Sequence, residues 1–299
     1  MRESLAIATA IVAALLLNLA IYLQKKAVLE LPEVKAKLSW SVVKAFITNG
    51  PWMFAQVINV SGFALYSVAL ALAPVSIVEP IIASGLVLLA YLAIKNLGEK
   101  PRRIDFFAMS ASVLGVIFLG VSLAEGIPKD VLRHPLEIWF IAAGILSLAV
   151  VIPVVMRRGS NNTQAAGLGI SVGLFFGMAA VFQRLLMVNL GHDWLLVGLF
   201  ILACVATYLP AFIILQAALQ KGMAMVVAPI YNGLMEFVPI VLGMAVLNEG
   251  FPHSDVLKAL RLVAFALILT GTVILSQRAE GDGVASTDLP EPERTAAGS

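Results

Sequence analysis

Two acidic residues of this sequence stand inside long apolar stretches, where an ionised side chain is poorly solvated. Glu236 lies about 13 residues into the run Met223–Leu247, which at 1.5 Å per helical residue places it about 20 Å from the start of that run. Glu79 lies near the start of the run Val75–Ala93. A carboxylate in such surroundings must be protonated, paired or bound to a cation, so both residues predict proton exchange or cation binding.

Glu79 is followed directly by Pro80, and this pair adds a second kind of oxygen. Proline lacks the backbone N–H and frees the carbonyl four residues earlier. The pair therefore predicts a helix broken near Pro80, where a carbonyl and a carboxylate could together bind a hard cation. The alternative is a carboxylate near a membrane surface that only reaches water.

Further polar groups interrupt the apolar runs and could line one cavity. Asn232 precedes Glu236 by one helical turn and shares its face, with Tyr231 beside it. Singly, such residues more often bridge neighbouring helices. The candidates for binding a substrate or coupling ion are Glu236, Glu79, Asn232, Tyr231, Asn18, Asn59, Tyr66 and Gln216. No catalytic group is recognisable, and the identity of any bound metal is left open.

The elements that carry these residues must be surrounded by lipid. The 299 residues are 60% hydrophobic and 13% charged, with a mean hydropathy of +0.96, whereas soluble domains average about 45–50% apolar and about 25% charged residues. The first apolar run is too long for the core of a signal peptide and lacks a cleavage site, so it predicts a retained span. The net charge of +2 suggests no nucleic-acid partner.

We expect an all-α membrane bundle, because the runs are continuously apolar rather than alternating. A span needs about 20 residues. Nine segments qualify: Leu5–Leu23, Pro51–Ala73, Val75–Ala93, Ile104–Leu123, Leu136–Met156, Ala165–Leu190, Trp194–Leu219, Met223–Leu247 and Leu257–Ser276. The short run Leu38–Thr48 reads as an interfacial helix, with a tenth span as the alternative. In the sixth segment, Gly169, Gly173 and Gly177 repeat every four residues and predict close helix packing.

Lysine and arginine are concentrated in the connections after odd-numbered spans, which places these connections in the cytoplasm. The C-terminus is then cytoplasmic. The N-terminus lies outside with nine spans and inside with ten. The expected location is the cell membrane, either the inner membrane of a bacterium or a plasma membrane.

The second to fourth spans resemble the seventh to ninth. Ala69, Leu70, Val78, Pro80 and Ile81 recur at one offset as Ala218, Leu219, Val227, Pro229 and Ile230, and Gln24-Lys25 recurs as Gln183-Arg184. An odd connecting helix between the halves inverts the second half, an arrangement typical of secondary transporters. We predict a first repeat over 1–123, with the short helix at 38–48, a connector over 124–164, a second repeat over 165–277 and a disordered cytoplasmic tail over 278–299.

The run from Ala71 to Pro80 (ALAPVSIVEP), followed by Leu97-Gly98-Glu99, resembles the drug/metabolite transporter superfamily, in an EamA-like arrangement. The resemblance is closest to its NIPA-type magnesium transporter branch and related bacterial permeases. It implies alternating access between inverted halves. The essential carboxylate of the small-multidrug-resistance branch corresponds approximately to Asn18, so that branch's coupling mechanism does not carry over.

Together these features predict a secondary transporter that carries a small metabolite, drug-like or cationic solute by alternating access, with protons as one coupling ion. Transport of Mg²⁺ or another divalent cation is the close alternative. An intramembrane lipid-acting enzyme or a non-transporting scaffold is the alternative of another class. No Walker motif is present, and we expect neither enzymatic activity nor a cofactor. The expected partners are the solute and membrane lipid, and a homodimer is possible. The sequence does not determine the coupling ion or the direction of transport.

Overall fold

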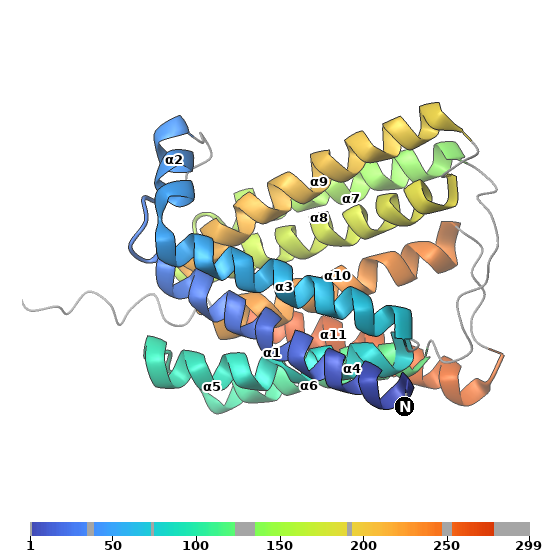
Figure 1. Cartoon of the computed structure of the whole chain (residues 1–299), viewed down its shortest axis with the longest axis horizontal. Coiled ribbons are helices and arrows are strands. Elements are labelled where there is room, and N and C mark those ends of the chain that lie inside the picture. Colours follow the sequence, from blue (N-terminus) through green and yellow to red (C-terminus); the bar gives the residue numbers. More distant parts are fainter. Residues whose placement is uncertain are drawn as a thin grey trace, which may run out of the picture.

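The computed structural model describes residues 2–34, 39–72, 75–122, 135–189, 193–246 and 253–277. In these residues the regular structure is helical throughout (Figure 1). The helices are α1 (Arg2–Val28), α2 (Trp40–Thr48), α3 (Gly50–Leu72), α4 (Val75–Ser84), α5 (Leu86–Leu97), α6 (Arg103–Ser122), α7 (Pro135–Met156), α8 (Asn161–Asn189), α9 (Trp194–Lys221), α10 (Ala224–Val246) and α11 (Asp255–Gln277). The predicted tail over 278–299 lies outside the described residues.

The prediction of a polytopic all-α membrane protein is confirmed. Eight helices are long and apolar enough to cross a membrane, and Ile81–Leu97 is a shorter apolar helical stretch. Large apolar side chains cover the outside of the bundle, among them Phe140 and Leu195, which are 78% and 83% exposed. Such a surface requires lipid as its solvent.

The third predicted span is two helices, α4 and α5, separated at Gly85. The expected break at Pro80 was wrong, because α4 runs through that proline without interruption. At Gly85 the cause is a tertiary contact. A Cβ on this residue would lie 2.8 Å from the carbonyl oxygen of Ala14 and would overlap the side chain of Asn18. The chain can pack this closely on α1 only because glycine has no side chain.

Within the run Leu38–Thr48, residues Trp40–Thr48 form the short helix α2, as expected, with Ser39 as its N-cap. Its nine residues extend about 14 Å, which is less than half of the hydrocarbon thickness. α3 begins at Gly50, only two residues after α2 ends. Among the described residues, α2 is therefore too short to be a tenth span.

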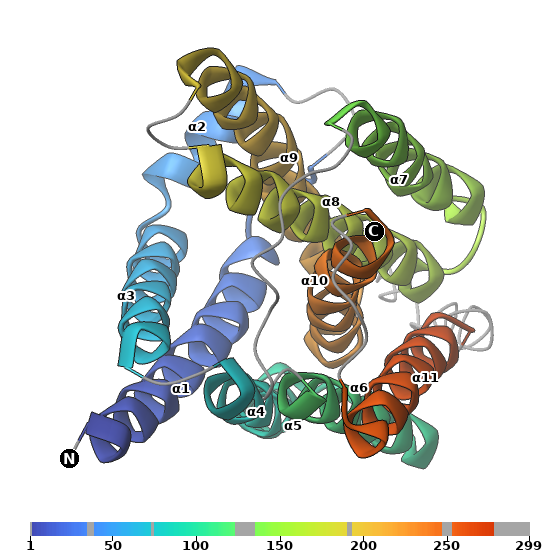
Figure 2. The same cartoon turned by 90° about the vertical axis from the view of Figure 1, so that its right-hand side faces the viewer.

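The helices form a ring of paired elements around α10. α1 packs along α3, α8 along α9, and α6 along α11. Viewed along the bundle, α10 lies between α8 and the α6–α11 pair (Figure 2). Among the elements in the described residues, α7 packs mainly on α8. The predicted repeats correspond to two groups of helices, α1 with α3 to α6 and α8 to α11, and α7 is the predicted connector.

The helix ends that carry most of the basic residues meet at one end of the bundle, which we call the basic end. Here α1 and α9 finish while α8 and α10 begin, as contacts of Lys25 with Gly222 and of Ala165 with Gly222 show. The opposite end, where α6 finishes and α11 begins, is the far end. Arg261 of α11 donates hydrogen bonds there to Ser122 of α6.

Equivalent contacts recur in the two groups. In the first, a Cβ on Gly62 of α3 would touch Leu17 of α1 at 3.0 Å. In the second, the residues at the same offsets, Ala211 of α9 and Phe176 of α8, lie in one apolar cluster. α1 ends at the basic end and α8 begins there, so equivalent helices run in opposite directions. These observations support the predicted inverted repeat and its residue boundaries, which stay a prediction.

The glycine spacing of α8 is confirmed as a close-packing surface. A Cβ on Gly173 would lie 2.6 Å from the Cβ of Leu234 and 2.9 Å from the carbonyl oxygen of Tyr231 in α10. One on Gly177 would lie 2.7 Å from the Cβ of Val238. Along this face, the backbone of α8 therefore packs directly against side chains of α10.

Replacing Gly173 by valine should separate α8 from α10. The nearest atoms belong to a Cβ and a backbone carbonyl, which cannot move aside like the end of a flexible side chain. We expect destabilisation of about 1–3 kcal/mol, the usual range for an overfilled core. Thermal unfolding in detergent measures it, with Gly144→Val as control because nothing lies within 4 Å of a Cβ there. Equal unfolding temperatures for the two variants would contradict the close packing.

Candidate functional site

α10 packs one of its sides against α8 and another against α11. Leu234 and Val238 face the glycines of α8. Phe237 faces α11, where its ring centre lies 4.9 Å from that of Phe265. Because successive residues turn by about 100° around a helix axis, Asn232 and Glu236 fall on the remaining side, which we call the acidic face of α10.

The acidic face offers several oxygen atoms within about one helical turn. Asn232 and Glu236 are both partly exposed there. Pro239 lies inside α10 and has no N–H, so the carbonyl of Met235 lacks its usual helical partner. A carboxylate, an amide oxygen and a free carbonyl are the ligand types that a hard cation selects.

Within the described residues no cluster of three or more His, Cys, Asp or Glu side chains is present. Among the described residues of α10, Glu236 is the only acidic one, so a cation bound by this face alone would keep part of its water shell. Mg²⁺ binds in this manner, because it gives up its water ligands reluctantly. The face suits a transient cargo better than a permanently bound structural ion.

Tyr231 and Gln216, both predicted at the site, are buried beside it rather than on the acidic face. Tyr231 turns toward α8, and its ring centre lies 6.4 Å from that of Phe176. Gln216 lies near the basic end of α9. Its Nε2 donates to Gln24 Oε1 at 3.0 Å, and its Oε1 accepts from Trp52 Nε1 at 3.0 Å.

Asn18 lies on α1 against the break between α4 and α5. Its Nδ2 donates to the carbonyl of Ala14 at 3.0 Å, and it packs on Gly85. The side chain is only 4% exposed and its Oδ1 has no hydrogen-bond partner. A buried acceptor without a donor is uncommon and is stabilised when a cation or a hydrogen-bond donor reaches it.

The remaining candidates are spread over the first half. Asn59 and Tyr66 are partly exposed on α3, and the ring of Tyr66 lies 6.1 Å from that of Phe63. Glu79 belongs to α4, but its side chain is outside the described part of the chain. Of the eight candidates, Glu236 and Asn232 thus lie on one face of α10. That the other six contribute to a solute site stays a prediction.

Sequence reasoning missed a set of buried polar residues that joins the two halves at the basic end. Lys25 of α1 is only 7% exposed. Its Nζ donates to the carbonyl oxygens of Leu219 at 2.5 Å and Gly222 at 2.7 Å, where α9 ends. The ammonium group thus caps the negative end of the α9 dipole.

Glu99 makes the complementary contact with the next helix. It is 8% exposed, and its carboxylate accepts from the N–H groups of Ala224 at 2.7 Å and Met225 at 3.2 Å. These are the first residues of α10, where the helix dipole is positive. A lysine and a glutamate of the first half therefore cap two consecutive helix ends of the second half.

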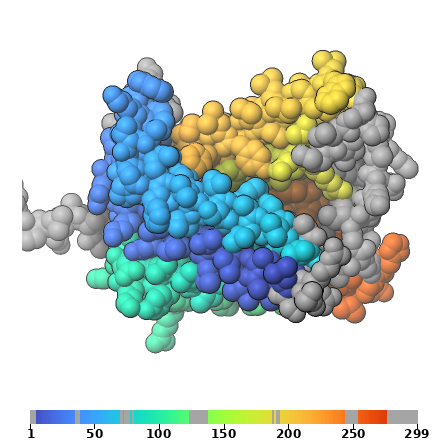
Figure 3. All heavy atoms as spheres, in the orientation of Figure 1, coloured from blue at the N-terminus to red at the C-terminus, as the bar shows by residue number. Residues whose placement is uncertain are grey.

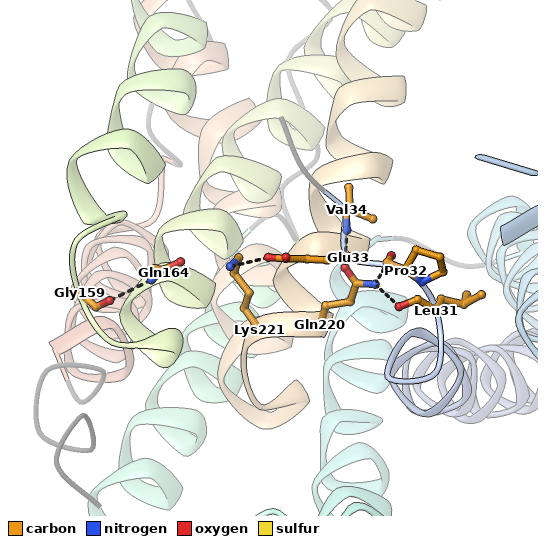
Figure 4. Close-up of polar contacts among 8 residues, drawn as sticks. All are labelled: Leu31, Pro32, Glu33, Val34, Gly159, Gln164, Gln220 and Lys221. Carbon is orange, nitrogen blue, oxygen red and sulfur yellow. Dashed lines mark hydrogen bonds and ion pairs between the residues drawn. The ribbon is translucent and has the colours of Figure 1, made fainter. Parts of the chain in front are cut away.

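Further polar contacts join the end of α9 to the segment that follows α1 (Figure 4). Gln220 at the end of α9 donates to the carbonyl oxygens of Val28 and Pro32 and accepts from the N–H of Val34 at 2.9 Å. Lys221 forms an ion pair with Glu33 at 3.2 Å. We call the contacts of Gln24, Lys25, Glu99, Gln216 and Gln220 the basic-end latch. Sequence signals for it existed, because Gln24 and Lys25 continue an apolar run and Glu99 closes the Leu97-Gly98-Glu99 motif.

Toward the far end the two halves are less tightly joined at the equivalent place. α3 meets α9 through Trp52, whose ring lies 6.0 Å from that of Phe212. Beyond this contact, in the space-filling view, a hollow separates α3 from α8, and atoms of α10 form its floor (Figure 3). On this face, the described residues of the two halves are joined at the basic end and separated by the hollow farther along the bundle.

Comparison with known proteins found one protein with a similar sequence. The chain is 26% identical over 271 residues to a protein described as probable magnesium transporter NIPA9 from Arabidopsis thaliana. The match covers 86% of this chain and 78% of the relative. No family model matches the sequence, and no solved structure matches the fold. The chain is thus similar over most of its length to a protein described as a probable magnesium transporter.

Proposed function

We propose that the chain is a multi-pass membrane transporter that moves a divalent cation, with Mg²⁺ as the first candidate, by alternating access. The observation that carries the proposal is the asymmetry of the bundle. The basic-end latch joins the halves on one side of the acidic face, and a hollow opens on the other side. A carrier must have this arrangement in one of its two states.

The choice of a cation rests on the acidic face and on the relative. Glu236, Asn232 and the carbonyl of Met235 provide oxygen ligands of the kind that Mg²⁺ binds. The similar Arabidopsis protein carries a description as a probable magnesium transporter. The preference of basic residues for the cytoplasm makes the basic end cytoplasmic, so the structure corresponds to an outward-facing state. Proton coupling stays a prediction.

A small organic solute is the second candidate cargo. Asn18 has a buried amide oxygen without a hydrogen-bond partner, and Asn59 and Tyr66 lie partly exposed on a helix of the same half. Amides and a phenol suit hydrogen bonding to a neutral or cationic organic molecule. A transporter of either cargo needs no catalytic residue, and we assign none.

Flux measurements in proteoliposomes decide between these cargoes. Purified protein is reconstituted, and entry of Mg²⁺ is followed with an enclosed fluorescent indicator, alongside other divalent cations and a panel of radiolabelled metabolites. Mg²⁺ entry well above that of protein-free vesicles is the expected result. Entry of a metabolite without any divalent cation would favour the organic cargo. Entry of neither would support a non-transporting scaffold.

A further inference from the structure

Arg184 occupies the position in α8 that Lys25 occupies in α1. The pair Gln183-Arg184 recurs at the offset of Gln24-Lys25. The same offset relates Phe176 to Leu17, and both residues pack on the helix that follows theirs in the repeat. Because the halves are predicted to be inverted, Arg184 lies toward the far end of the bundle, whereas Lys25 lies at the basic end.

The partners of Lys25 also have counterparts. Lys25 binds the carbonyl of Leu219 near the end of α9. The repeat matches Leu219 with Leu70, two residues before the end of α3. The mirror image of the basic-end latch is therefore a contact between Arg184 and the last carbonyls of α3.

That contact would close the hollow seen in this structure. The hollow lies between α3 and α8, the two helices that the mirrored latch would join (Figure 3). At present the glutamine beside Arg184 bonds within its own half, since Gln183 Oε1 accepts from Tyr208 at 2.7 Å. Ser67 of α3, which matches Gln216, is exposed and donates to the carbonyl of Phe63. Gln183 and Ser67 thus each form a hydrogen bond within their own half. In a second state, these bonds can be replaced by a contact between the two residues.

We propose that Arg184 is the far-end counterpart of Lys25. In the state open at the basic end, its guanidinium caps the C-terminal carbonyls of α3 while Gln183 approaches Ser67, which closes the far end. Arginine suits this position because its five N–H donors can bind several carbonyls at the negative end of a helix dipole. The inference rests on the proposed alternating access. It is confined to Arg184, because Glu249, the counterpart of Glu99, lies outside the described residues.

Crosslinking of paired cysteines tests the proposal. In a Cys204→Ala background, one protein carries Ser67→Cys with Gln183→Cys and a second carries Gln24→Cys with Gln216→Cys. A short homobifunctional thiol reagent is used, because these positions need not meet the narrow geometry of a disulfide. We expect both pairs to crosslink, each in its own state of the transporter.

Charge removal should then shift the two yields in opposite directions. Lys25→Met is expected to raise the yield of the 67–183 crosslink about 10- to 100-fold relative to the 24–216 crosslink, and Arg184→Met to lower it similarly. Arg158→Met, an exposed arginine outside both contacts, should change neither yield. A monodisperse elution profile and an unchanged thermal unfolding temperature in detergent confirm that each variant is folded.

Absence of the 67–183 crosslink in every variant, including Lys25→Met, would overturn the inference, as would equal effects of Arg184→Met and Arg158→Met. The crosslinks form without any transported ion. If flux fails while the crosslinks exchange as expected, the proposed cargo is wrong and the role of Arg184 stands. If Mg²⁺ flux is intact but the 67–183 pair never crosslinks, only the role of Arg184 is wrong.

Discussion

Replacing Glu236 by glutamine is expected to reduce Mg²⁺ flux about 10- to 100-fold in proteoliposomes. Glutamine keeps the size of the side chain and one oxygen but removes the negative charge. Among the described residues of α10, Glu236 is the only acidic one. Losing a charge-assisted interaction with the ion corresponds to about 1.5–3 kcal/mol, which gives that range of fold-change.

The matched control for this prediction is Glu30→Gln, the same substitution at an exposed glutamate just after α1. It should leave flux unchanged, whereas Glu236→Asp, which retains the charge on a shorter side chain, should keep part of it. Wild-type flux in Glu236→Gln with a normal elution profile would exclude the acidic face as the path of the cation. If the cargo is instead a neutral metabolite, Glu236→Gln should reduce its flux by much less than tenfold.

The helices were predictable because their signal is local. A membrane span is a property of about 20 consecutive residues, and the continuous apolar runs of this chain exceed that length repeatedly. Glycine spacing in α8 was equally readable, since three glycines one turn apart expose backbone to a neighbour whatever that neighbour is. Here the neighbour is α10, which brings Leu234 and Val238 against the glycines.

The break in the third span was misplaced because its cause is not local. Pro80 carried the stronger sequence signal, yet a proline near the middle of a short helix loses only one hydrogen bond. Gly85 stands in an ordinary apolar run and ends α4 because Asn18 and Ala14 of α1 lie against it. Nothing in residues 75–97 specifies that contact.

The site was only partly predictable for a related reason. Asn232 and Glu236 share a face at helical spacing, so their association could be derived from one helix. Gln216 was expected among the groups that line the cavity, and the structure places it in the basic-end latch. Lys25 was counted among the basic residues that indicate orientation. Its function as a helix cap depends on the position of the end of α9, and the sequence of α1 carries no information about that position.

The latch and the acidic face are therefore connected through one helix. Glu99 binds the first two N–H groups of α10, and Glu236 lies on the same helix nearer its middle. Release of Glu99 would free the start of α10 to move relative to α5. In the proposed cycle, opening of the basic end and exposure of the acidic face to that side are therefore coupled through α10.

Replacing Lys25 by methionine is accordingly expected to shift the protein toward the state open at the basic end by about 10- to 100-fold. In the closed state the substitution leaves the carbonyls of Leu219 and Gly222 without this donor and removes the attraction between Lys25 and Glu99. In the open state water can satisfy the same groups, so the penalty falls on the closed state. Each lost charge-assisted hydrogen bond is worth about 1.5–3 kcal/mol, offset in part because the lysine itself no longer needs to be desolvated.

The shift is measured by the reactivity of a cysteine at position 218 in a Cys204→Ala background. Ala218 is fully buried in the apolar cluster at the basic end, so a maleimide added from that side reacts only when the latch opens. Lys26→Met is the matched control, because Lys26 is the next residue of α1 and is exposed. Faster labelling in Lys25→Met than in Lys26→Met is expected. Equal labelling rates would mean that Lys25 stabilises the fold without favouring either state. Closure of the basic end would then have to depend on the other contacts of the basic-end latch.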